Sequence, residues 1–141
     1  MTTLFSTSIT VPQTSAIPRG RVALAVLWLT QIAIAAMFLF AGGLKLTGAP
    51  EMVGVFDAIG IGQWFRYVTG SIEVLSALAL LVPASAVFGA LLLIPTMIGA
   101  VITHLFIVGG SPLPATVLLI GSAAVAWARR DQLPSVLSRW S

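Results

Sequence analysis

The sequence predicts an all-α integral membrane protein, with four transmembrane helices in one bundle and a short interfacial helix in the first extramembrane loop. Three observations lead to this fold class. Hydrophobic residues make up 58% of the 141 residues and charged residues only 8%, whereas a soluble domain carries about 25% charged residues. Four long apolar segments are separated by one longer connection and two short turns. The chain is short enough to form a single compact domain.

The positions of the arginines indicate the topology. They gather at the two ends of the chain, as Arg19, Arg21, Arg129, Arg130 and Arg139. Because basic residues stay on the cytoplasmic side, both termini are expected in the cytoplasm, with the chain in the inner (plasma) membrane of the cell. Residues 1–21 are then a flexible cytoplasmic tail, residues 22–128 the four-span domain and residues 129–141 a basic cytoplasmic tail. The connection at 47–65 lies outside.

The first predicted span covers residues 22–44. At about 1.5 Å of rise per residue it is long enough to cross a hydrocarbon core of about 30 Å. One set of residues recurs at helical spacings of 4, 3, 4 and 3 and therefore shares a face: Gln31, Ala35, Phe38, Gly42 and Lys45. This face is expected to point into the bundle, because it holds an amide, small residues and a lysine.

The long connection is expected to contain a short amphipathic helix over residues 50–59, lying at the membrane interface. Four apolar residues fall on one side of it at helical spacing: Met52, Val55, Phe56 and Ile59. Gly60 should end this helix, because glycine tolerates the left-handed conformation of a helix stop. Trp64, Phe65 and Tyr67 then form an aromatic belt where the chain re-enters the bilayer.

The remaining spans are expected at about residues 66–82, 84–108 and 113–128. The span at 66–82, the second of the four, carries Glu73. An acid inside a bilayer costs at least a few kcal/mol unless it finds a partner. Counted by helical rise, Glu73 lies about 9 Å and His104 about 6 Å inward from the outer face, where Lys45 ends the first span. Lys45, Glu73 and His104 are therefore expected to occupy one layer of the bundle.

Two interpretations of these residues are open. In the first, Glu73 and His104 handle protons, since imidazole titrates near neutrality, and a ligand is bound by four further residues: Lys45, Gln31, Phe56 and Met97. In the second, Glu73 and Lys45 form a structural pair, Gln31 is a hydrogen bond between helices, and the apolar residues only pack.

Other chemistry has little support in the sequence. There are no cysteines, which excludes disulfides and thiol chemistry. A single histidine and scattered acids give no credible zinc or haem ligand set, so no metal and no intrinsic cofactor are expected. The net charge of +3 comes mainly from arginines at the chain ends, which favours contact with an anionic leaflet over nucleic-acid binding.

Several short motifs together resemble a known family. They are Gly42-Gly-Leu-Lys45-Leu at the end of the first span, Met52, Phe56 and Gly60 in the connection, Thr69-Gly-Ser-Ile-Glu73, and Met97 with Ala100 and His104. In this order and spacing they resemble the DoxX and DoxX-like family of small bacterial membrane proteins, over about residues 25–128. One departure is Gln63 after Gly62, where members often have a proline.

The resemblance implies a four-helix membrane protein. It also implies one of two functions. The first is that of a subunit, catalytic or accessory, in a quinone-linked redox system of respiration or oxidative stress, with a quinone as the possible ligand. The second is that of a non-enzymatic membrane anchor, assembly partner or binder of a small lipophilic molecule. Expected partners are the lipid bilayer, another protein or a second copy of the chain, and a lipophilic small molecule.

Overall fold

The structure is a computed structural model that describes residues 20–138, with only the backbone for residues 135–137. The expected N-terminal tail therefore lies almost entirely outside the described residues, as do Arg139 and Trp140. In the described part all regular structure is helical: α1 (Arg21–Thr47), α2 (Pro50–Ile59), α3 (Gln63–Leu81), α4 (Ala86–Thr103), η1 (His104–Val108), α5 (Leu113–Ala128) and α6 (Gln132–Leu137).

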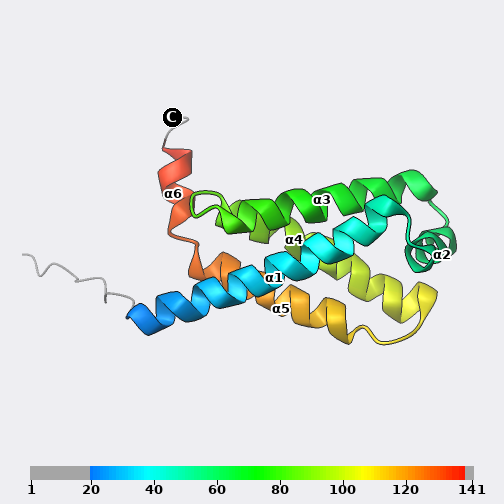
Figure 1. Ribbon diagram of the computed structural model, residues 1–141, viewed down its shortest axis with the longest axis horizontal. Coiled ribbons are helices and arrows are strands. Elements are labelled where there is room, and N and C mark those ends of the chain that lie inside the picture. Colours follow the sequence, from blue (N-terminus) through cyan, green and yellow to red (C-terminus); the bar gives the residue numbers. More distant parts are fainter. Residues whose placement is uncertain (1–19, 139–141) are drawn as a thin grey trace, which may run out of the picture.

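The long helices run back and forth along one direction (Figure 1), with α2 at one end and α6 at the other. Helix α1 packs against α3, α3 against α4, and α4 against α5, while α1 also contacts α5. The short helix α2 contacts α1, α3 and η1. The end of the molecule that holds α2 is therefore closed by a helix that lies across the ends of the long ones.

Within residues 20–138, three helical segments are long and apolar enough to cross a membrane: α1, α3, and the continuous segment Ala86–Val108 formed by α4 and η1. Helix α5 is also apolar but has only 16 residues, fewer than the approximately 20 that a span usually needs. Large apolar side chains point outward, among them Phe106, Leu29 and Trp127, which are 79%, 68% and 70% exposed. Such a surface is suited to lipid rather than to water. The chain is an all-helical membrane protein.

Glycines bring α1 and α3 into close contact. A Cβ atom on Gly42 would lie 2.8 Å from Val74 Cγ2 and 2.9 Å from the carbonyl oxygen of Gly70. A Cβ atom on Gly70 would lie 2.9 Å from the Cβ of Lys45. Only glycine fits at these positions, as is common where membrane helices approach closely. The close crossing sets Lys45 of α1 against the face of α3 that carries Glu73.

The helix boundaries differ from the predicted ones at several ends. Helix α1 continues to Thr47, three residues past the predicted end at residue 44, and α4 begins at Ala86 rather than at residue 84. Helix α3 begins at Gln63, three residues earlier than expected, so that Gln63 lies inside it. The predicted span at 84–108 is α4 followed by a π-helix, η1, which starts at His104. The predicted stop at Gly60 is confirmed, because Gly60 has φ 78° and is left-handed. π-Helical turns are rare in proteins, and those that occur often lie at functional sites.

Candidate functional site

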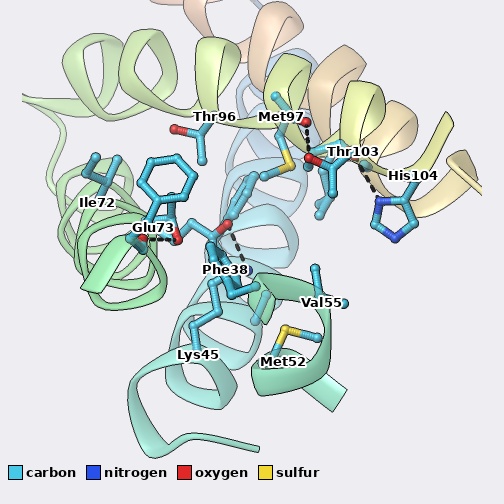
Figure 2. Close-up of a pocket in the computed structure, with 18 of the residues that line it drawn as sticks. Phe38, Lys45, Met52, Val55, Ile72, Glu73, Thr96, Met97, Thr103 and His104 are labelled. Atoms are coloured by element: carbon cyan, nitrogen blue, oxygen red, sulfur yellow. Dashed lines mark hydrogen bonds and ion pairs between the residues drawn. The ribbon is translucent and has the colours of Figure 1, made fainter. Parts of the chain in front are cut away.

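A pocket of about 610 Å³ lies at the α2 end of the long helices (Figure 2). It is lined by residues of α1, α2, α3, α4, η1 and α5. Most of the lining is apolar, and three phenylalanines contribute to it: Phe38, Phe56 and Phe65. A cavity of about 300–1,000 Å³ with apolar walls and a few polar groups is typical of small-molecule sites.

The apolar face of α2 forms one wall of this pocket. Met52, Val55, Phe56 and Ile59, the four residues predicted to share a side, all line the pocket. Phe56 is buried, and its ring packs edge-on against Phe65 of α3 at a centroid distance of 5.8 Å. The predicted helix is therefore present, and its apolar side faces the pocket and α3.

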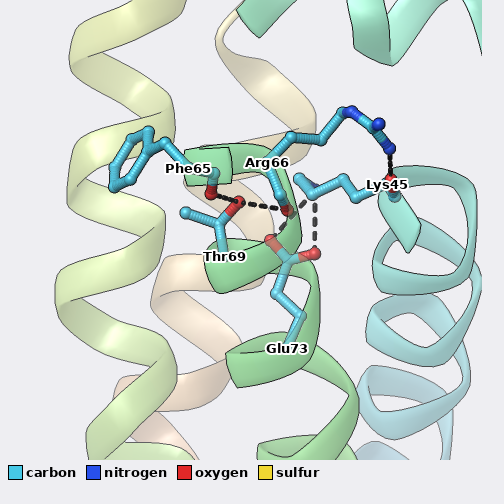
Figure 3. A network of polar contacts seen from close by, with 5 residues as sticks. All are labelled: Lys45, Phe65, Arg66, Thr69 and Glu73. Carbon is cyan, nitrogen blue, oxygen red and sulfur yellow. Dashed lines mark hydrogen bonds and ion pairs between the residues drawn. The ribbon is translucent and has the colours of Figure 1, made fainter. Parts of the chain in front are cut away.

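Lys45 and Glu73 form an ion pair in the pocket wall (Figure 3). The Nζ atom of Lys45 lies 2.8 Å from Oε2 and 3.1 Å from Oε1 of Glu73, so it donates to both carboxylate oxygens. The side chain of Glu73 is 2% exposed and that of Lys45 16% exposed. A charge-assisted bond of this kind offsets part of the cost of removing the two charges from water. The ammonium is the more accessible partner.

Arg66 holds the end of α1 in place, and sequence reasoning missed this role. Its Nη1 donates to the carbonyl oxygen of Lys45, which belongs to the last turn of α1 and has no partner within the helix. Its Nε donates to Gln63 Oε1 at 2.6 Å, and its guanidinium lies 4.2 Å from the centre of the Tyr67 ring. Arg66 is buried, at 4% exposure.

A sequence signal for Arg66 was present. It precedes Glu73 by seven residues, with Gly70 between them, and residues spaced 4 and 3 apart share a helix face. The structure buries all three on α3. The predicted start of the second span at residue 66 placed Arg66 at the very end of the helix, whereas α3 begins at Gln63 and carries Arg66 inside the fold.

His104 lines the same pocket from η1. Its Nδ1 lies 2.9 Å from the carbonyl oxygen of Ala100, one turn earlier. Figure 2 places His104 and Glu73 on opposite sides of the pocket. Met97 and Ala100, which form one of the family-like motifs with His104, also line the pocket, so all three reach it. The pocket thus has the Lys45–Glu73 pair on one side and an imidazole on the other.

Gln31 lies outside this pocket, so the structure does not bring it together with the other proposed ligand-binding residues. Its Nε2 donates to the carbonyl oxygen of Leu80 on α3, and its Oε1 accepts a hydrogen bond of 3.2 Å from Arg129 Nε. Gln31 is fully buried. It links three parts of the fold, α1, α3 and the end of α5, which is the interhelical role that was its alternative interpretation.

No group of three or more histidine, cysteine, aspartate or glutamate side chains within residues 20–138 could hold a metal ion. The polar groups around the pocket can instead donate and accept hydrogen bonds to an organic molecule. Fold and pocket together define a helical membrane protein with a cavity of ligand size.

The family follows from comparison with known proteins. Residues 29–129 match the sequence model of the DoxX-like family, which covers well over half of the chain. The protein belongs to the DoxX-like family. No match was found among curated proteins or among solved structures.

Proposed function

We propose that this DoxX-like protein is a membrane subunit of a quinone-linked redox system and that its pocket binds a quinone-like lipophilic ligand. The observation that carries the proposal is the Lys45–Glu73 ion pair in the wall of an otherwise apolar pocket of about 610 Å³. A quinone has an apolar ring, and its polar oxygens need hydrogen bonds inside a protein. Aromatic walls and one charged pair meet both requirements.

Lys45 is the group that would bind the ligand head. An ammonium carries three hydrogens, and two of its hydrogen bonds go to the oxygens of Glu73. One donor therefore remains for a ligand oxygen. Glu73 holds the ammonium in position, and the carbonyl of Lys45 is in turn held by Arg66. The donor is thus preorganised, which lowers the entropic cost of binding.

Glu73 and His104 are the proposed proton-handling groups. Reduction of a quinone takes up two electrons and two protons, and oxidation of the quinol releases them. A carboxylate and an imidazole on two sides of the pocket could take up or release the protons. The electrons would pass through a partner protein, so this chain would supply binding and proton transfer.

The topology proposed with this function has four spans. Helix α5 would be a short fourth span, since it packs along α4 and carries no charged residue. Arg21 and Arg130 then lie at the cytoplasmic end of the inner membrane, while α2 lies at the opposite interface (Figure 1). This follows the bias of basic residues toward the cytoplasm.

A second function is favoured by one specific observation. The contact of Gly42 with Gly70, the Lys45–Glu73 pair and the Arg66 contact all fasten α1 to α3. In a non-enzymatic membrane anchor or assembly partner, these contacts would serve only to hold α1 and α3 together, and no ligand would be required. In that case the pocket would hold only lipid chains.

The experiment that tests the proposal is mass spectrometry of lipophilic molecules that co-purify with the full chain in mild detergent. A quinone or quinol retained near one molecule per chain, and depleted in Lys45→Met, supports the proposed function. Recovery of phospholipid alone from both proteins, with no quinone, favours the anchor.

A further inference from the structure

The hydrogen-bonding capacity of the pocket is unequal: its polar side chains offer many acceptors and few donors. Six polar side chains line it: Lys45, Thr69, Glu73, Thr96, Thr103 and His104. The state of each can be read from its contacts, because a hydrogen already given to a backbone carbonyl is not available to a ligand.

The hydroxyl groups of the three threonines can offer a ligand only their oxygen lone pairs, because their hydrogens are already donated to backbone carbonyls. Thr96 Oγ1 donates to the carbonyl oxygen of Leu92 at 2.9 Å, and Thr103 Oγ1 donates to that of Gly99 at 2.9 Å. Thr69 Oγ1 likewise donates to carbonyl oxygens of the preceding turn at 3.1 Å. A hydroxyl has a single hydrogen, so each of these groups can accept from a ligand but can donate only by giving up its helix bond.

His104 also presents an acceptor. The carbonyl oxygen of Ala100 can only accept, so Nδ1 of His104 must carry the hydrogen of their 2.9 Å contact. In the neutral ring the other nitrogen, Nε2, then has a lone pair and no hydrogen. Within the described part of the chain Nε2 has no hydrogen-bond partner. It is an acceptor on the side of the pocket away from Glu73.

Lys45 is the one side chain among these six with a hydrogen to spare. Glu73, ionised in its pair with Lys45, adds further acceptor lone pairs. A bound molecule therefore meets one donor and several acceptors. An acceptor-only molecule, such as a quinone, satisfies Lys45 but has no hydrogen to give to the free lone pairs of the other groups. His104 Nε2 is then left without a partner, and an unpaired polar group in an apolar site lowers affinity.

The geometry points to a lipophilic phenol or hydroquinone, a molecule with at least one hydroxyl hydrogen, as the ligand this pocket prefers over the corresponding quinone. The hydroxyl donates to His104 Nε2 or to a threonine Oγ1, and a second oxygen accepts from Lys45. This inference rests on the proposed function and narrows it to the reduced form of the ligand.

The test uses three probes with the same alkyl tail: 2-decyl-1,4-benzoquinone, 2-decyl-1,4-hydroquinone, and the dimethyl ether of that hydroquinone, which has the same ring but no donor. Binding to the full chain in mild detergent is measured without oxygen, with the amount taken up by empty micelles subtracted. We expect the hydroquinone to bind about five- to tenfold more tightly than the quinone or the ether, the effect of one additional hydrogen bond.

Two variants locate the acceptors. His104→Phe keeps an aromatic ring but removes Nε2, and Thr103→Val keeps the side-chain shape but removes Oγ1. At least one should reduce the preference for hydroquinone to about twofold or less, since it removes the added hydrogen bond. Thr30→Val is the matched control, because Thr30 lies on α1 outside this pocket, and it should keep the full preference.

The possible results separate the two proposals. Tighter binding of the quinone, or equal binding of quinone and hydroquinone, overturns the preference for the reduced ligand and leaves the proposed function standing. Failure of all three probes to bind overturns the proposed function itself and the preference with it. A full preference retained in both His104→Phe and Thr103→Val contradicts the assignment of the acceptors.

Discussion

Glu73 and Lys45, 28 residues apart in the chain, meet through both carboxylate oxygens at the place where two glycines let their helices touch. The ion pair and the helix crossing depend on each other. Without Gly42 and Gly70 the backbones would stand farther apart, and without the pair a carboxylate would lie unpaired inside the fold. The pair therefore stabilises the crossing and also furnishes the polar group of the pocket.

The first prediction concerns the energy of this pair. Glu73→Gln removes the anion and leaves the Lys45 ammonium without its partner, which for a buried pair costs about 3–5 kcal/mol, less what Lys45 recovers by turning outward. The double variant Lys45→Met, Glu73→Gln should be more stable than Glu73→Gln alone, because no unpaired charge remains. Thermal unfolding in mild detergent measures both. A double variant less stable than either single variant would show that the charges do not act as a pair.

The second prediction concerns Arg66. Arg66→Lys keeps the charge but loses the planar fork that reaches both the Lys45 carbonyl and Gln63, so it should lose most of the stability that Arg66→Met loses. Each should unfold at a lower temperature than the wild type. Arg21→Lys, at an exposed position, is the control and should change nothing. Full stability of Arg66→Lys would mean that only charge matters here.

The third prediction concerns topology. The chain has no cysteines, so a single introduced cysteine is the only site for a thiol reagent. Cysteine at Glu51 should be labelled from outside intact cells by an impermeant maleimide, and cysteine at Gln13 only after the membrane is opened. Labelling of both from outside would rule out four spans with cytoplasmic termini, because α1 lies between the two positions and would then not cross the membrane.

The fourth prediction separates proton handling from scaffolding. If Glu73 and His104 move protons, Glu73→Gln and His104→Gln should each lower quinone-coupled activity of membranes about a hundredfold or more per folded molecule, the lower end of the range for loss of a general acid or base. The amount of folded protein is measured by gel filtration in detergent. Wild-type activity per folded molecule in both variants would leave only the structural role of the pair.

Much of this arrangement could be predicted from the sequence. The spacing of Gln31, Ala35, Phe38 and Gly42 gave the buried face of α1, and all four are buried. The spacing of Met52, Val55, Phe56 and Ile59 gave the apolar side of α2. Periodicity is reliable here because a side chain's place on a helix depends only on its spacing along the chain.

Other features depended on tertiary contacts that spacing does not encode. Gln31 and Lys45 share a helix face, but they are 14 residues apart in the chain, which is roughly 21 Å along the helix axis. They therefore contact different parts of the fold. The spacing of Arg66, Gly70 and Glu73 places Arg66 on the buried face of α3, but its partner is a backbone carbonyl, which no side-chain pattern reveals. The π-helical start at His104 also had no visible signal, although it sets where the imidazole points.

The most direct test of the ligand pocket fills it from Gly99. This glycine lines the pocket, and a Cβ atom there would meet no heavy atom within 4 Å, so Gly99→Leu should occupy the cavity without straining the fold. Gly43→Leu is the matched control, since Gly43 also has open space around a Cβ but does not line the pocket.

The measurement is binding of 2-decyl-1,4-hydroquinone to the wild type and to both variants, with thermal unfolding recorded alongside. The account predicts that Gly99→Leu unfolds at the wild-type temperature but binds at least tenfold more weakly, while Gly43→Leu binds as the wild type does. Equal binding by all three proteins, or equal loss in both variants, would contradict the claim that this pocket is the ligand site.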